Sequence, residues 1–252
     1  MLTNSIAIAV WNEKGGCGKT TTAIGLAGAA SKDRDVILID LDPQTNATEW
    51  LLGEVPNGPG TLELLAGKAP LSECTYEVDG HSRLRVVPAS QRLVRVIAEL
   101  EDNPMPQLAL RNALVGDREA LVIIDCPPAY GELPVMALAA ATHHLLPLKP
   151  AAMDLQATRS SLRRADAIRT QINPGLMLAG FVLTLFDART SVASATETLL
   201  LNTYPDLPIV RIPSAVVVGM APGAHQLLED YAPLSPATIA YQMAATKIVP
   251  AV

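Results

Sequence analysis

The stretch KGGCGKTT at residues 14–21 decides the fold of this 252-residue chain. It follows an apolar run, Ser5–Trp11, that predicts a buried strand, and it opens a segment, Lys19–Ala30, with the pattern of a helix. A phosphate-binding loop requires this context, because glycines let successive backbone N–H groups crowd a phosphate and the helix N-terminus adds partial positive charge. The residues expected to cradle the phosphates are Lys14, Gly15, Gly16, Cys17, Gly18, Lys19, Thr20 and Thr21.

Two lysines and a threonine carry the chemistry of this loop. Lys19 is expected to reach the β- and γ-phosphates, and the Thr20 hydroxyl is expected to ligate Mg²⁺. Glu13 stands where the first glycine of the strict spacing belongs, and the loop has a second lysine, Lys14, in exchange. The alternative, a glycine-rich turn with incidental lysines, does not account for the strand before it and the helix after it.

Two further apolar strands end in aspartates. Val36–Asp40 (VILID) runs into Asp42, and Ala120–Asp125 (ALVIID) runs into two prolines. Either segment alone is compatible with a plain helix cap or turn residue. Because both follow a phosphate loop, we expect these carboxylates to lie at neighbouring strand ends, where they hold Mg²⁺ and place water.

These three segments together resemble the motifs of the ParA/MinD family of ATPases. Residues 13–21 match the deviant Walker A loop xKGGxGKT(S/T), residues 40–48 match the switch I segment DxDPQxNAT, and residues 122–128 match the Walker B strand φφφDxPP. The resemblance implies an ATP-dependent homodimer in which Lys14 crosses the interface to the partner's nucleotide. It also implies that Asp42 orients the attacking water and that Pro127 begins switch II.

The resemblance assigns the remaining site residues as well. Asp40 and Asp125 would hold Mg²⁺, mostly through water. The expected catalytic residues are therefore Lys14, Lys19 and Asp42, and the expected metal ligands are Thr20, Asp40 and Asp125. In the second half, residues 184–190 (TLFDART) resemble the family's T-x-F/Y-D-x-R-T turn. Pro213 falls where the adenine packs in the family, although a proline that merely ends a strand is the alternative.

Binding to DNA is a further expectation, because relatives that use the nucleoid do so through lysines and arginines in their C-terminal half. The candidates here are Arg159, Arg163, Arg164, Arg169 and Arg189. Arg159 and Arg163 are four residues apart and would share a helix face. The alternative is a solvated face balanced by Asp154 and Asp166. Since the net charge is −6, binding over the whole surface is disfavoured, and any DNA binding should be sequence-independent and salt-sensitive.

Other features predict a cytoplasmic protein, which would associate with the nucleoid if it binds DNA. The three cysteines are far apart and form no CxxC pair, so neither a zinc site nor a disulfide framework is predicted. Cys126, beside the Walker B aspartate, is expected to be a small buried residue. The longest apolar stretch, residues 133–148, is shorter than a membrane span. A C-terminal end with one lysine, Lys247, does not supply the basic amphipathic anchor of the MinD branch.

Apolar runs alternate with helical patterns along the whole chain. This rhythm predicts an α/β fold with a doubly wound, mostly parallel sheet and helices on both faces, as one P-loop ATPase domain spanning residues 1–252. The other expected strands are Leu84–Pro88, His144–Leu148, Leu178–Leu185 and Leu207–Arg211. The other expected helices are Gln91–Glu101, Asp154–Thr170, Ser194–Asn202 and Pro236–Lys247.

We therefore predict slow hydrolysis of ATP to ADP and phosphate in a dimerising switch for plasmid or chromosome partition. No residue looks like a built-in arginine finger, so a ParB-like adaptor is expected to accelerate turnover. One alternative is a positioner of a protein cargo, such as a carboxysome or a chemotaxis cluster. Another is a metabolic P-loop enzyme that activates a carboxylate with ATP, which would not account for Lys14 together with the DPQ segment.

Overall fold

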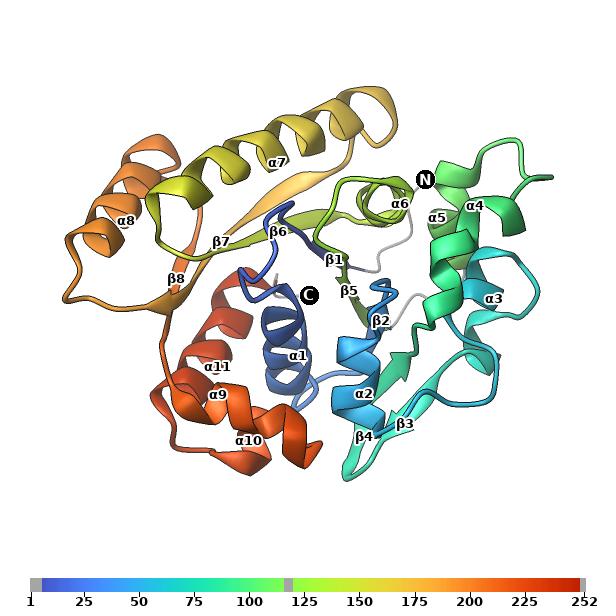
Figure 1. Ribbon diagram of the computed structural model, residues 1–252, viewed down its shortest axis with the longest axis horizontal. Helices are drawn as coiled ribbons and strands as arrows, with labels where there is room; N and C mark the ends of the chain where they lie inside the picture. Colours follow the sequence, from blue (N-terminus) through green and yellow to red (C-terminus); the bar gives the residue numbers. More distant parts are fainter. Residues whose placement is uncertain (1–5, 116–119, 250–252) are drawn as a thin grey trace.

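The computed structural model describes residues 6–115 and 120–249, without the side chains of residues 152–155. In this part of the chain, eight strands form one sheet in the order β3-β4-β2-β5-β1-β6-β7-β8. The strands are β1 (Ala7–Val10), β2 (Val36–Asp40), β3 (Tyr76–Val78), β4 (His81–Val87), β5 (Leu121–Asp125), β6 (His143–Leu148), β7 (Met177–Phe186) and β8 (Ile209–Pro213). Neighbouring strands are parallel except for the antiparallel pair β3 and β4. The predicted α/β fold is confirmed (Figure 1).

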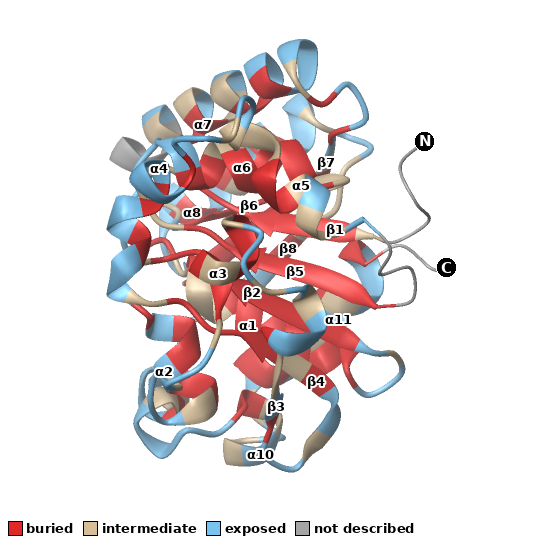
Figure 2. Ribbon diagram, turned by 90° about the vertical axis from the view of Figure 1, so that its right-hand side faces the viewer, coloured by how far each residue is buried: buried red, intermediate tan, exposed pale blue. Residues whose placement is uncertain are grey.

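Helices cover both faces of this sheet. The α-helices are α1 (Lys19–Ala30), α2 (Asn46–Leu52), α3 (Thr61–Leu65), α4 (Val96–Glu99), α5 (Ala109–Ala113), α6 (Glu132–Ala140), α7 (Ala152–Gln171), α8 (Ser191–Thr203), α9 (Val216–Met220), α10 (Leu228–Tyr231) and α11 (Pro236–Ile248). The 3₁₀ helices are η1 (Leu71–Glu73), η2 (Gln91–Arg95), η3 (Pro106–Leu108) and η4 (Ala221–Ala224). Figure 2 shows the strands as a buried layer between helices whose outer faces are exposed.

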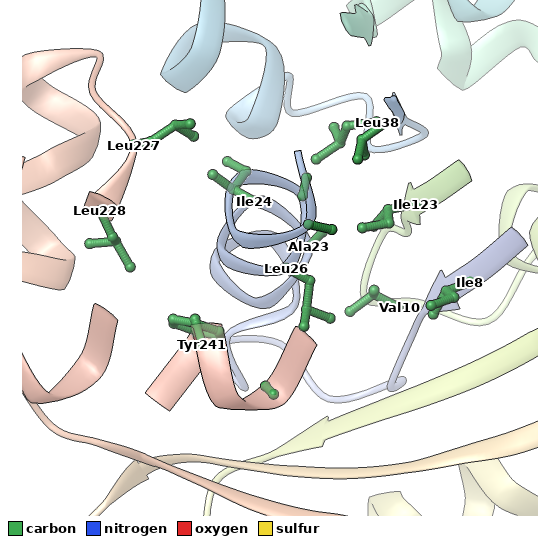
Figure 3. Close-up of a cluster of buried hydrophobic side chains, with 14 of the residues drawn as sticks. Ile8, Val10, Ala23, Ile24, Leu26, Leu38, Ile123, Leu227, Leu228 and Tyr241 are labelled. Atoms are coloured by element: carbon green, nitrogen blue, oxygen red, sulfur yellow. The ribbon is translucent and has the colours of Figure 1, made fainter. Parts of the chain in front are cut away.

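The core divides according to the alternation of side chains along each strand. Ile8 and Val10 of β1 join a cluster that contains residues of α1, α2, α10 and α11, part of which is drawn in Figure 3. Ala9 and Trp11 join a second cluster with residues of α3, α5, α6 and α7. This period of two explains why the strands are apolar throughout, since both faces of a covered parallel sheet are buried. A smaller third cluster lies between β6, β7 and α8.

Helix α1, which begins at the phosphate loop, is packed closely against α11. A Cβ atom on Gly25 would lie 2.6 Å from Cγ of Tyr241, a distance that real Cβ contacts do not show. The Tyr241 hydroxyl also lies 3.5 Å from the Thr22 hydroxyl of α1. Glycine at position 25 is therefore required for the buried tyrosine to lie flat on α1, and this contact fixes the helix that carries the loop.

Several predicted element boundaries are corrected by the structure. The expected helix Gln91–Glu101 is wrong, because this segment divides into η2 and α4. The buried residues Leu93 and Val96 are three apart, as suits a 3₁₀ turn, whereas Val96 and Leu100 are four apart, as suits an α-turn. The expected strand Leu207–Arg211 is shifted, so Pro213 is the last residue of β8 and does not follow it. A proline is tolerated there because β8 is an edge strand.

The order of the strands brings the predicted site together. β1 lies between β5 and β6, and β5 lies between β2 and β1, all running parallel. Asp125 pairs in register with Asp40 on one side and with Val10 on the other. The aspartates and the start of the phosphate loop therefore meet at one edge of the sheet, where ligands bind in open α/β folds. Among the described residues, no helix is long and apolar enough to span a bilayer.

Candidate functional site

The loop between β1 and α1 contains three glycines, of which Gly15 and Gly16 are exposed. Gly16 and Gly18 have φ angles of 71° and 79°, in the left-handed region that favours glycine. A Cβ atom on Gly15 or Gly16 would have no neighbour within 4 Å, so space lies beside this part of the loop. Gly18 is the N-cap of α1 and offers no side-chain acceptor to the first turn. The N–H groups at the start of α1 therefore remain available for an anion.

Lys19 and Lys14 differ in their surroundings. Lys19 is 7% exposed, and its Nζ donates a hydrogen bond to the carbonyl oxygen of Lys14 at 2.9 Å. The Lys14 side chain lies at the surface. One loop therefore presents one buried and one exposed ammonium group.

The loop is held by its own Asn12 and by side chains of two other elements, Ser161 of α7 and Thr184 of β7. Asn12 Nδ2 donates to the Pro147 carbonyl at 2.9 Å, and Asn12 Oδ1 accepts from the Lys14 N–H and from the Ser161 hydroxyl. The Thr184 hydroxyl of β7 donates to the Cys17 carbonyl at 2.9 Å. A Cβ on Gly18 would lie 3.1 Å from Thr184 Cγ2, so this brace leaves little room for a larger residue there.

Asp40 braces the segment that follows β2. It is fully buried, and its oxygens accept from the Asp42 N–H at 2.9 Å, the Thr48 N–H at 2.9 Å and the Thr48 hydroxyl at 2.7 Å. Burial raises the pKa of Asp40 to about 6, and these hydrogen bonds partly oppose the increase. Asp40 therefore holds both ends of residues 42–48 and has little accepting capacity left for a metal.

Asp125 is in the opposite condition. It is fully buried, and neither of its carboxylate oxygens has a hydrogen-bond partner among the residues that the structure describes. Burial and then the nearby Asp40 raise its pKa well above the usual range, whereas Thr20 and Lys19 partly offset the shift. A buried carboxylate without a donor needs a cation or a proton. A carboxylate beside a threonine hydroxyl suits Mg²⁺, a hard ion that prefers oxygen ligands.

This arrangement also fits the way in which Mg²⁺ is usually held. Within the described residues, no group of three or more His, Cys, Asp or Glu side chains is placed to bind a metal ion. Magnesium sites in nucleotide-hydrolysing enzymes typically use one or two carboxylates and complete the shell with water and substrate phosphates. The donor set of Thr20 and Asp125, with Asp40 alongside, is therefore sufficient for this ion when a triphosphate is present.

Asp42 lies in a tight turn after β2. It is 7% exposed, and its Oδ1 accepts from the Gln44 N–H at 3.0 Å. The next residue in the turn, Thr45, has a φ angle of 59°, unusual for a β-branched residue, and its hydroxyl donates to Glu49 at 2.7 Å. Strained backbone of this kind clusters at switch regions and active sites. The turn holds Asp42 at the same sheet edge as Asp125, whose pKa responds to it.

Not every predicted residue joins this cluster. Pro213 pairs with Phe186 at the end of β8, three strands away from β1, so its contact with an adenine base stays a prediction. Cys126 is buried and burial raises its thiol pKa, in agreement with a small core residue. The bracing roles of Asn12 and Ser161 could not be predicted from local sequence, because their partners lie more than 130 residues away along the chain.

The five candidate arginines have different environments. Arg159 and Arg163 are exposed on α7. Arg169 is paired with Asp166, and Arg189 forms a bidentate pair with Asp187 whose pKa it lowers to about 2. The side chain of Asp154, the other expected partner on this helix, lies outside the described residues. Arg164 turns towards the phosphate loop and donates to Glu13 Oε2 at 2.9 Å, so it does not share the open face of its neighbours.

A parallel sheet with a glycine-rich loop after β1, an ammonium group inside that loop and aspartates at the ends of two adjacent strands defines a P-loop nucleotide hydrolase. A family model described as an AAA domain matches residues 5–178. The chain is 36% identical over 244 residues to the chromosome-partitioning ATPase Soj of Thermus thermophilus, an alignment that covers 96% of this chain and 94% of Soj.

Two solved structures are similar to this chain as well. Cobyrinic acid a,c-diamide synthase from Mycobacterium smegmatis, with a bound ATP analogue and magnesium, is 30% identical with a TM-score of 0.81, covering 97% of this chain and 94% of that one. An ATP complex of McdA from Cyanothece has a TM-score of 0.85 at 22% identity, covers 99% of each chain and supports the fold alone. The chain belongs to the ParA/MinD family of P-loop ATPases. It is an ATPase whose cofactors are ATP and Mg²⁺.

Proposed function

We propose that this chain is a nucleotide-switched ATPase for DNA partition that works as a homodimer. The observation that carries the proposal is the contrast between the two lysines of one loop. Lys19 is buried within its own loop, where it would serve the nucleotide of its own chain, whereas Lys14 is exposed. An exposed lysine in a phosphate loop is placed to reach a nucleotide that a second copy holds, so ATP would stabilise the dimer and hydrolysis would release it.

Hydrolysis would use side chains that already lie together at one edge of the sheet. Lys19 would neutralise charge that develops on the β- and γ-phosphates, and Asp42 would orient the attacking water. Thr20 and Asp125 would hold Mg²⁺, with Asp40 acting through water and through the segment that it braces. When bound, Mg²⁺ supplies positive charge to the phosphate oxygens. Lys14 of the second copy would add a further positive charge in trans.

DNA binding is proposed for the exposed face of α7. Arg159 and Arg163 are one helical turn apart and both exposed, so both can contact phosphates. Arg164 and Arg189 fit this role less well, because carboxylates already pair with them. The similarity to a relative named as a chromosome-partitioning ATPase supports partition as the role. A ParB-like adaptor that stimulates hydrolysis, and a cytoplasmic location at the nucleoid, complete the proposal.

A gel shift with nonspecific duplex DNA tests this function. Retardation is expected with ATP and not with ADP, and it should weaken as salt is raised from 50 to 200 mM. Substituting both Arg159→Gln and Arg163→Gln should reduce the slope of log affinity against log salt by about 2 for each chain of the dimer that contacts DNA, since each lost phosphate contact removes about 1. The control is Arg92→Gln. This substitution removes an exposed arginine of η2 that pairs with Glu63 of α3. Absence of retardation with either nucleotide at both salt concentrations would overturn DNA binding.

A second candidate is a small-molecule synthase that activates a carboxylate with ATP, and the 30% identity to cobyrinic acid a,c-diamide synthase favours it. That function would not account for Lys14 together with the DPQ segment at residues 42–44. The two are separated by what stimulates turnover: DNA with an adaptor protein in the partition function, and a carboxylate substrate with an amide donor in the other. Positioning of a protein cargo would share the ATPase chemistry and differ in the adaptor.

A further inference from the structure

Arg164 joins three parts of the site that the sequence does not connect. From α7, its Nε donates to Glu13 Oε2 at 2.9 Å. Its guanidinium carbon also lies 4.1 Å from the centroid of the Tyr130 ring, within cation–π distance. The Arg164 side chain is 39% exposed, and that of Glu13 is 28% exposed. The arginine is therefore held between the phosphate loop on one side and the segment after β5 on the other.

Both partners occupy sensitive positions. Glu13 immediately precedes Lys14, and its own N–H donates to the Ser161 hydroxyl of α7 at 3.0 Å, so α7 holds both its backbone and its side chain. Tyr130 lies five residues after Asp125, in the segment between β5 and α6. The centroid of the Tyr130 ring also lies 6.1 Å from that of the fully buried Trp11, the residue that follows β1.

These contacts are well suited to change during a reaction cycle. An exposed or half-exposed ion pair adds little to stability, because water screens it, and a cation–π contact at such a site is also weak. Neither contact is needed to hold the phosphate loop in place, since Asn12 and Thr184 already brace the loop through buried hydrogen bonds. Weak contacts from one arginine to Glu13 and to Tyr130 can instead set the position of the phosphate loop relative to the segment after β5, and they can break at a small cost in free energy.

We propose that Arg164 is a positioning residue for ATP hydrolysis, which links Glu13 at the start of the phosphate loop to Tyr130 after the Asp125 strand so that the two segments move together. Arg164 touches neither phosphate nor metal in this role. Arg164 would fix the position of the backbone that carries Lys14 relative to the segment between β5 and α6. That segment would have to respond when the γ-phosphate leaves. The inference rests on the ATPase activity and not on DNA binding, so the two can fail separately.

The test compares Arg164→Gln with Arg211→Gln in the full chain. Arg211 is a matched control, because it also pairs with a glutamate, Glu197, and also lies over an aromatic ring, Phe186, at 5.1 Å. We expect kcat of Arg164→Gln to fall about tenfold, inside the range that a small misplacement of reacting groups costs. Affinity for fluorescent ADP should change less than about twofold, because the loop and its buried braces remain. Arg211→Gln should change neither.

Trp11 supplies a readout that a merely structural role would not change. The chain has two tryptophans, so a Trp50→Phe background leaves Trp11 as the single one. Its emission should differ between ADP and a non-hydrolysable ATP analogue, and Arg164→Gln should remove that difference. If Arg164→Gln does not fold, Tyr130→Leu removes the ring half of the contact from an exposed position and should give the same two changes. An unchanged kcat and an unchanged emission difference in either variant would overturn the proposal.

Discussion

At the scale of single residues, the charged groups of the site differ in their hydrogen bonds and in their burial. Asp40 has three donors on its carboxylate, whereas the adjacent Asp125 has none within the described part of the chain. Two carboxylates paired in register therefore differ in their hydrogen bonds: Asp40 braces the segment after β2, and Asp125 is the one proposed to hold Mg²⁺. Lys19 and Lys14 show a similar division, because burial separates them within one loop.

Two substitutions separate binding from hydrolysis at this scale. Lys19→Ala should weaken ATP binding at least about tenfold, since a hydrogen bond to a charged group contributes about 1.5–3 kcal/mol. Asp42→Ala should retain ATP and lower kcat by about 100-fold or more, because only the placement of water is lost. Equilibrium binding of fluorescent ATP together with single-turnover hydrolysis measures both. Equal loss of binding in the two variants would show that Asp42 does not act on water alone.

At the scale of elements, much of the architecture was predictable and the connections were not. The pattern of short apolar runs located seven of the strands, and the ends of α1 and β2 were predicted to the residue. The short strand β3 was missed, because three residues of mixed burial carry no periodic signal. Helices α2, α3, α5, α6, α9 and α10 were missed as well, since they are short or apolar on all sides and tertiary packing decides them.

For the candidate site too, the sequence predicted local motifs but did not predict contacts between distant segments. Lys19, Asp42 and Asp125 stand in contiguous motifs, so their positions follow from local sequence. The partner of Arg164 does not, because Glu13 lies 151 residues away and only the fold brings the two together. The sequence therefore suggested a DNA-facing role for an arginine that the structure turns towards the phosphate loop.

The contact between α1 and α11 gives a prediction at the element scale. Gly25→Ala should lower the free energy of unfolding by about 1–3 kcal/mol, because a methyl group cannot fit against the buried Tyr241 ring. Gly219→Ala on the exposed helix α9 is the control, since a Cβ there meets nothing within 4 Å and alanine favours helix. Urea unfolding of both variants gives the comparison. Equal stability of the two variants would mean that α11 shifts freely on α1.

At the scale of the whole molecule, the buried sheet makes stability depend on pH through His144. Its ring is fully buried beside Trp11, and its Nε2 lies 2.9 Å from the Trp11 carbonyl oxygen. Burial lowers its pKa from 6.5 to about 4. Between these values the unfolded chain binds a proton that the folded chain excludes, so this contribution to stability is present above pH 6.5 and is lost as the pH falls towards 4.

The size of this effect can be measured against a matched variant. From pH 7.5 to 5.0 the wild-type chain should lose about 2 kcal/mol more unfolding free energy than His144→Gln, which keeps an N–H donor for Trp11 and does not titrate. Urea titrations of both proteins at the two pH values provide the four numbers required. Parallel pH profiles would indicate that another buried group governs the acid limb.

The central claim concerns two copies of the chain, since one lysine is proposed to complete the site of its neighbour. Light scattering of the protein saturated with a non-hydrolysable ATP analogue tests it most directly. The mass should rise from 26.6 kDa to about twice that value for the wild type, and it should stay at the single-chain value for Lys14→Ala although the analogue is still bound. A wild-type chain that remains a monomer at saturation would contradict the account.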